Sequence, residues 1–151
     1  MPEIDFAFLA DAADAQPGQK FNVLGGGVTR IGGQAFPLTH PHLALVISMT
    51  VTSPEVGASH ELGFLLLGPD GAEISRAEAQ IRADGVPGGA DAQVTFALDL
   101  WNLTFTSPGE YSFRVLVAGS ERKRLALTLE RAAGRPGSGV VPIFPPVTGR
   151  A

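Results

Sequence analysis

The sequence predicts an all-β fold, an antiparallel β-sandwich of about eight strands followed by an extended C-terminal tail. Three observations support this prediction. Apolar and polar residues alternate with a period of two, which is typical of strands with one buried face. Turn residues recur at intervals of roughly ten positions, as in β-sandwiches, and no segment requires a helix. An immunoglobulin-like topology and a jelly-roll or C2-like topology both fit this pattern, so the two alternatives stay open.

Eight segments carry the alternation. In chain order they are residues 3–9, 20–31, 43–51, 60–67, 72–82, 94–105, 111–117 and 124–130. In the first, Ile4, Phe6 and Phe8 share one face. The second is interrupted by three glycines at 25–27, which favour a bulge or a close backbone approach over a phosphate-binding loop. The fourth ends at the turn 69–71, where proline presets φ and glycine accepts a positive φ.

The fifth segment, residues 72–82, is expected to return as a strand. Its residues Ile74, Ala77 and Ile81 also fit a helical stripe, so the helical alternative stays open here. In the sixth segment the apolar phase changes at Trp101, which predicts a bulge or a bend in that strand.

The last two segments form a predicted β-hairpin, because they alternate on either side of Gly119 and Ser120. The turn before the seventh segment leads into a strand with Tyr111 at its second position. This arrangement resembles the tyrosine corner of immunoglobulin-like folds, in which the phenol hydrogen-bonds back across the corner.

The composition excludes several function classes. The chain has 151 residues, a net charge of -4 and no cysteine, so cysteine-ligated metals, thiol catalysis and a disulfide framework are all excluded. We expect no nucleic-acid partner, because the net charge is negative. We expect no membrane partner, because no apolar run approaches the roughly 18 residues of a membrane span. Glu3 and Asp5 stand where a signal peptide needs basic residues, which predicts a cytoplasmic protein.

Several short motifs carry a resemblance to a known family. They are the run Glu3–Asp11, the run Phe21–Gly27, His40–Leu43, Gly68–Gly71, and Asn102–Phe105 leading to Gly109–Tyr111. Together they resemble an uncharacterised family of small bacterial all-β proteins, a domain of unknown function, over about residues 3–130. The resemblance implies a bacterial origin and a sandwich fold, and it supplies no catalytic residues.

The three histidines are the candidate metal ligands. His40 and His42 are two residues apart near the start of a strand, and His60 from the next strand is the possible third ligand of a zinc or iron site. Pro41 between the first two bends that geometry, so a structural role is favoured and we expect no metal, no cofactor and no catalytic residue.

Residues 132–151 differ from the rest of the chain, which divides it into a sandwich domain at 1–131 and a Gly/Pro-rich tail. The stretch from Val140 to Val147 is too apolar for a neutral linker and has too many prolines for a central strand. Such a segment can dock along a sheet edge or in a groove. The candidate partner-binding residues are Val140, Val141, Ile143, Phe144 and Val147.

These observations favour a non-catalytic structural or protein-interaction module. Its tail would dock on a protein partner or on a second copy, which makes a homo-oligomer one expected outcome, and a clasp on its own sandwich stays open. The alternative is a sandwich that binds a small ligand or a glycan, with Trp101 and Tyr111 as aromatic platforms. A metal-dependent enzyme on the three histidines is the least favoured hypothesis.

Overall fold

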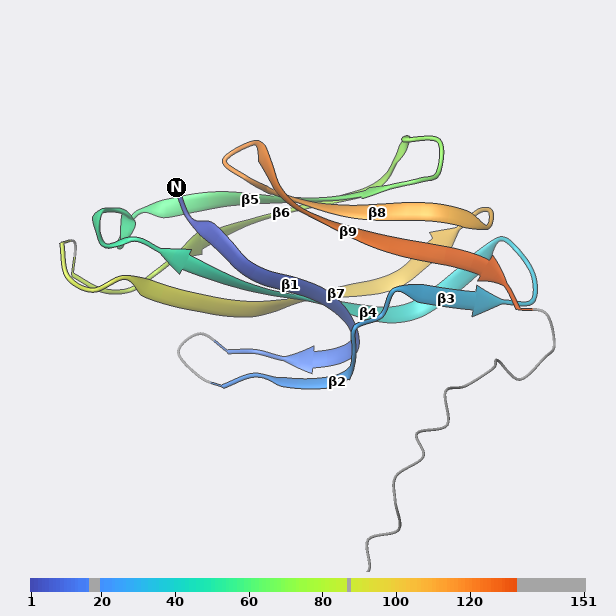
Figure 1. The fold of residues 1–151 in the computed structure, drawn as a ribbon, viewed down its shortest axis with the longest axis horizontal. Helices are drawn as coiled ribbons and strands as arrows, with labels where there is room; N and C mark the ends of the chain where they lie inside the picture. The colour runs from blue at the N-terminus through green and yellow to red at the C-terminus, as the bar shows by residue number, and fades with distance from the viewer. Residues whose placement is uncertain (17–19, 87, 133–151) are drawn as a thin grey trace, which may run out of the picture.

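The structure is a computed structural model, and it describes residues 1–16, 20–86 and 88–132. Two sheets pack face to face, which confirms the predicted all-β sandwich (Figure 1). Sheet A has the strand order β2-β1-β4-β7, and sheet B has the order β3-β9-β8-β5-β6. The elements are β1 (Glu3–Asp14), β2 (Asn22–Gly26), β3 (Arg30–Gly33), β4 (Leu38–Val51), a 3-10 turn η1 (Ser53–Glu55), β5 (Ser59–Leu67), β6 (Glu73–Arg82), β7 (Ala92–Phe105), β8 (Gly109–Val117) and β9 (Ser120–Arg131).

The core lies between the two sheets and is filled by alternate residues of the central strands. On β4 the inward positions are aliphatic and fully buried, and those of β5, β8 and β9 face them from the other sheet. The largest of these side chains are Leu43, Leu45, Ile47, Met49, Leu62, Leu66, Phe105, Tyr111, Leu127 and Leu129. Burial of this apolar surface is the main force that holds the sheets together. Among the described residues no helix is long and apolar enough to cross a membrane.

The single strand predicted at 20–31 is in fact two strands that belong to different sheets. β2 pairs with β1 in sheet A, whereas β3 runs parallel to β9 in sheet B. The glycines between them explain the division, because Gly25 and Gly27 have φ values of 60° and 82° that favour glycine. The amides of Gly27 and Val28 both donate to the carbonyl of Leu9, and the chain passes from one sheet to the other there.

β1 is longer than predicted and pairs with two strands. Its first part pairs with β4 as far as Ala10, and from Ala10 onward it pairs with β2. The resulting β1–β2 hairpin folds back beneath sheet A (Figure 1), where Phe21 lies against Phe6 with ring centroids 5.9 Å apart. Val46 and Ser48 on the outer face of sheet A are therefore fully buried although they point away from the core.

The bulge considered for the strand at 94–105 is absent. The β4–β7 ladder keeps one register from Leu38 opposite Phe105 to Val51 opposite Ala92. The change of phase is produced by Asn102, which has a left-handed φ of 51° between two paired neighbours. A residue in that conformation turns the side chains that follow it without adding a residue to the strand.

Two other local predictions are confirmed. Residues 72–82 form the strand β6 and not a helix. The tyrosine corner is present, because the Tyr111 hydroxyl donates to the Ser107 carbonyl oxygen at 2.7 Å. The buried ring of Tyr111 also meets Phe105 edge to face, with centroids 5.0 Å apart.

Candidate interaction surface

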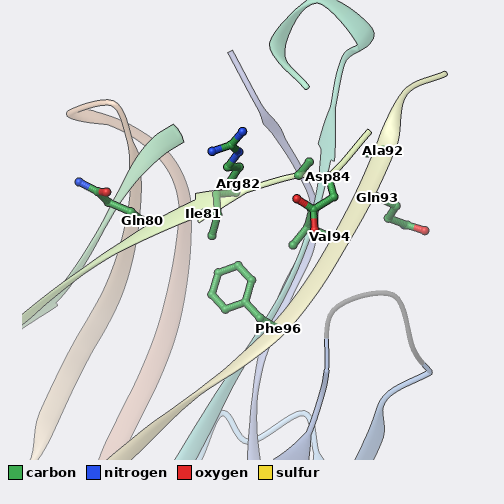
Figure 2. A pocket seen from close by; sticks show the side chains of 9 residues that line it. Gln80, Ile81, Arg82, Asp84, Ala92, Gln93, Val94 and Phe96 are labelled. Atoms are coloured by element: carbon green, nitrogen blue, oxygen red, sulfur yellow. The ribbon is translucent and has the colours of Figure 1, made fainter. Parts of the chain in front are cut away.

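Two edge strands, β6 of sheet B and β7 of sheet A, lie on the same side of the sandwich. A hollow of about 440 Å³ opens between the second half of β6 and the first half of β7. Figure 2 shows the apolar side chains of Ile81 and Phe96 in this hollow, and its lining also includes the polar residues Gln80, Arg82, Asp84 and Gln93. We call this region the open side.

The lining of the hollow combines large and small apolar side chains. Ile81, Val94 and Phe96 are the large ones, and Ala83 and Ala92 are small. Phe96 reaches across the space between the sheets and meets Phe64 with ring centroids 6.4 Å apart. The inward residues of both edge strands stay partly exposed where the central strands are fully buried.

The free backbone groups of β6 follow from the hydrogen-bond alternation of the sheet. The Ala118 amide donates to the Glu61 carbonyl, so the backbone groups of Glu61 face β8 and those of its neighbour Leu62 face β6. Leu62 lies opposite Ala79, which therefore uses its own backbone groups for β5. The alternation leaves the backbone N–H and C=O groups of Glu78, Gln80 and Arg82 directed away from the sheet.

The same reasoning gives the free edge of β7. The Leu9 carbonyl accepts a hydrogen bond from the Gly27 amide, so the backbone groups of Leu9 point away from β4. The backbone groups of its neighbour Phe8 therefore point toward β4. The alternation continues through β4, whose residue Ile47 uses its backbone groups for Phe96 on β7. Within the described part of the chain, the backbone groups of β7 that point away from β4 are those of Thr95, Ala97 and Asp99.

Charged side chains occur along the whole of β6. Near its start, Arg76 binds Glu73 through an Nε–Oε1 contact of 2.8 Å and lies 3.8 Å from a carboxylate oxygen of Glu78. The hydrogen bond from the guanidinium lowers the pKa of Glu73 below its ordinary value. Charged side chains protect edge strands against indiscriminate pairing. Beside the hollow the edge carries the neutral Gln80 followed by the charged Arg82.

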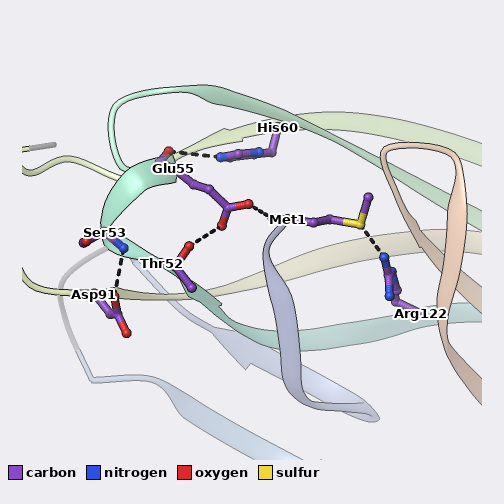
Figure 3. Close-up of polar contacts among 7 residues, drawn as sticks. All are labelled: Met1, Thr52, Ser53, Glu55, His60, Asp91 and Arg122. Atoms are coloured by element: carbon purple, nitrogen blue, oxygen red, sulfur yellow. Dashed lines mark hydrogen bonds and ion pairs between the residues drawn. The ribbon is translucent and has the colours of Figure 1, made fainter. Parts of the chain in front are cut away.

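The far end of the open side is closed by the η1 turn (Figure 3). The Ser53 amide donates to Asp91 at 2.8 Å, and the Gly57 amide donates to the Ala83 carbonyl at 3.0 Å. Val56 and Ala83 are buried together in a small second core. These contacts hold the β6–β7 connection in place and keep the edges of the hollow fixed.

The structure does not bring the three histidines together. His40 and His42 lie on β4 beside Leu103 and Trp101 of β7. His60 lies at the start of β5, where its ring N–H donates to the Glu55 carbonyl at 3.2 Å (Figure 3). Within residues 1–16, 20–86 and 88–132 no group of three His, Asp or Glu side chains is arranged to hold a metal ion.

His42 has instead a structural environment of its own. Its Nδ1 lies 2.8 Å from the Asp11 carbonyl oxygen and its Nε2 lies 2.7 Å from Asp99 Oδ1. The partner atoms, a carbonyl and a carboxylate oxygen, both accept hydrogen bonds, and the tautomer of the ring decides which nitrogen donates. His42 thereby connects the β1–β2 hairpin to β7, and its ring lies under Trp101 with centroids 4.2 Å apart.

The two aromatic platform candidates differ. Tyr111 is 2% exposed and belongs to the tyrosine corner, so its assignment as a platform is wrong. Trp101 is 67% exposed on the edge strand β7. The tail candidates Val140, Val141, Ile143, Phe144 and Val147 lie outside the described residues.

Sequence reasoning missed the open side. No local signal marks its apolar residues Ile81, Val94 and Phe96, because each stands in an apolar alternation like that of core strands.

Comparisons with known proteins give a family and little beyond it. Residues 5–130 match the family described as "Family of unknown function (DUF6941)". Comparison with curated proteins gave no match. A solved structure that the chain is similar to is the Pseudomonas fluorescens alkylpurine DNA glycosylase AlkC bound to DNA containing an abasic site analog, at 14% identity and a TM-score of 0.46. The match covers 85% of this chain and 30% of the glycosylase chain.

Proposed function

This chain belongs to DUF6941, a family of unknown function, and we propose that it is a non-catalytic interaction module that binds an extended apolar segment of protein at its open side. The observation that carries this proposal is the combination of a hollow of about 440 Å³, with Ile81, Val94 and Phe96 among its lining residues, and strand edges beside it. A hollow alone accepts many ligands, but unpaired backbone groups next to it favour a peptide backbone.

Binding would follow the physics of strand addition. An incoming segment that pairs with Gln80 and Arg82 gains main-chain hydrogen bonds without any rearrangement of sheet B. Because side chains alternate along a strand, every second residue of that segment points toward Ile81 and Phe96. Backbone pairing supplies affinity in this arrangement, and the size of the hollow supplies selectivity for a large apolar side chain.

The tail remains the proposed docking segment of the module, and a protein partner or a homo-oligomer remains the proposed assembly. The bacterial cytoplasm stays the proposed compartment, because the chain has no cysteine for the disulfides that many small secreted domains carry.

The proposal is tested by panning a library of short random peptides on phage against the full-length chain. We expect enrichment of peptides with a large apolar residue. Their binding should fall at least tenfold for Gln80→Pro, which removes an amide that β5 does not use, and should be unchanged for the control Gln80→Ala. Circular dichroism checks that both variants keep the fold. Enrichment of no peptide, or of peptides that bind both variants equally, would show that the open side is not the binding surface.

A second candidate function is favoured by one specific observation, the exposure of Trp101. A flat indole that is 67% exposed beside the Asp99 carboxylate suits the apolar face and the hydroxyl groups of a sugar ring. Titration with maltohexaose and cellohexaose, followed by the fluorescence of this single tryptophan, tests the glycan alternative. No change with either sugar would remove support for it.

A further inference from the structure

Resting on the proposed function, we infer that the segment bound at the open side is Val140–Val147 of a second copy of this chain, with Phe144 in the hollow. The segment carries no charge, and Phe144 is its one aromatic residue. The floor that it would meet is formed by Ile81, Val94 and Phe96, which are all partly exposed. Covering them with an aromatic side chain removes apolar surface from water on both partners.

The prolines limit how far the segment can pair. In an antiparallel strand added to β6, the bonding residues point their side chains outward, as Gln80 does, and the inward residues direct their amides away from β6. With Phe144 pointing inward, Pro142 and Pro146 also point inward, so their missing amides cost no bond to β6. Val141 and Ile143 stand at bonding positions and have amides. Pro145 stands at a bonding position without an amide, so amide pairing with the edge ends at Ile143.

The length of the tail decides whether Phe144 can reach the hollow of its own sandwich or only that of a second copy. β9 ends and β7 begins at opposite ends of the long axis (Figure 1). The ladder places Ser120 in the same row as Ala79, by way of Val117 and Leu62. With about 3.3 Å per residue along β9 and about 4.8 Å between strands, Ala132 lies about 45 Å from Ile81.

The chain between Ala132 and Phe144 is too short to cover that distance unless it is almost fully extended. Phe144 follows Ala132 by 12 residues, which span at most about 42 Å when fully extended. The intervening residues include Gly134, Gly137 and Gly139, and a flexible run of this length has an end-to-end distance of about 20 Å. An intramolecular clasp with Phe144 in the hollow is therefore disfavoured, whereas a second copy approaches without this restraint.

The experiment uses the absence of cysteine in the chain, because engineered cysteines are then the only ones present. Full-length protein with Gln80→Cys alone is mixed with full-length protein carrying Ile143→Cys alone, and Arg82→Cys is tried as a neighbouring position. All three changes leave Phe144 in place. Opposite outward residues of paired strands lie close enough for a disulfide. We expect a mixed disulfide dimer on oxidation, identified by mass.

Two controls accompany the mixture. Leu24 is 72% exposed on β2, away from the open side. Protein with Leu24→Cys in place of Gln80→Cys, mixed with the Ile143→Cys protein, should give at most a tenth of the mixed dimer. Adding Phe144→Asp to the Ile143→Cys chain should reduce the mixed dimer to the same level, because a carboxylate does not enter an apolar hollow. Equal cross-linking with Leu24→Cys would overturn the inference.

A chain that carries both Gln80→Cys and Ile143→Cys separates the remaining outcomes. A cross-linked monomer from this chain, without mixed dimers in the other experiment, would overturn the assignment to a second copy. If no cross-link forms while phage peptides still bind in a manner that depends on Gln80, the inference fails and the proposed function stands. Light scattering should show a dimer for the unmodified protein and a monomer for Phe144→Asp.

Discussion

Phe64 and Phe96 meet edge to face across the two sheets, with ring centroids 6.4 Å apart and an angle of 74° between their planes. This contact joins β5 to β7 at the floor of the open side. Phe96 lines the hollow together with Ile81 and Val94, whereas Ala83 and Ala92 in the same lining are small.

Filling the space should block binding without harming the fold. Ala92 lines the hollow and is partly exposed, so the added carbons of Ala92→Leu enter this space and the free energy of unfolding should change by less than about 1 kcal/mol. Binding of phage-selected peptides, measured by surface plasmon resonance, should weaken at least tenfold. The control Ala97→Leu makes the same change on the outer face of β7 and should leave binding intact. Unaltered binding to Ala92→Leu would place the peptides elsewhere.

The tyrosine corner should contribute measurably to stability. Tyr111→Phe removes the hydrogen bond to the Ser107 carbonyl and leaves the ring in place, so the free energy of unfolding should fall by about 1 kcal/mol. Urea denaturation followed by circular dichroism measures the change. Thr106→Ala, at an exposed position of the same turn, is the matched control and should have little effect. Equal effects of the two substitutions would contradict a specific role for the phenol.

Gly109 should tolerate alanine less well than Gly71. Both have positive φ values, 147° and 81°, which are unfavourable for alanine. A Cβ at Gly109 would also lie 2.7 Å from Pro69 Cγ, whereas a Cβ at Gly71 meets nothing within 4 Å. We expect Gly109→Ala to lower the melting temperature more than Gly71→Ala does. The reverse order would show that the contact with Pro69 is easily relieved.

The fluorescence of Trp101 should depend on its contact with His42. The exposed indole should be quenched strongly by acrylamide, because it is 67% accessible to solvent. The imidazole of His42 packs against this indole with ring centroids 4.2 Å apart, so His42→Ala should change its fluorescence yield. His40→Ala is the control, since His40 pairs with Leu103 and not with Trp101. An unchanged yield in His42→Ala would indicate that the two rings are not in contact in solution.

Local patterns were sufficient for most strands and for the tyrosine corner. Period-two alternation located the segments around Leu45, Leu66 and Phe113, because one face of each strand must be apolar to enter the core. The same logic failed at 20–31, where one run of residues belongs to two sheets. It also suggested a bulge at Trp101, because the alternation does not distinguish an added residue from the left-handed Asn102.

The candidate site was less accessible to sequence reasoning. The composition of the tail suggests a docking segment, which stays a prediction, and no pattern in the chain says which strands are outermost. The histidines illustrate the same limit, since His42 and His60 are near in sequence and yet lie on strands of different sheets with different partners. Only the pairing of strands decides which side chains converge.

By itself, the sequence determined the fold class, the turns and the apolar character of residues 140–147, because these depend on local periodicity and composition. The tertiary structure decided that β6 and β7 end their sheets on the same side, with unpaired backbone groups beside a hollow. The physical reason is that hydrogen bonds between strands connect residues far apart in the chain. Which edges remain free is therefore settled only after all other strands have paired.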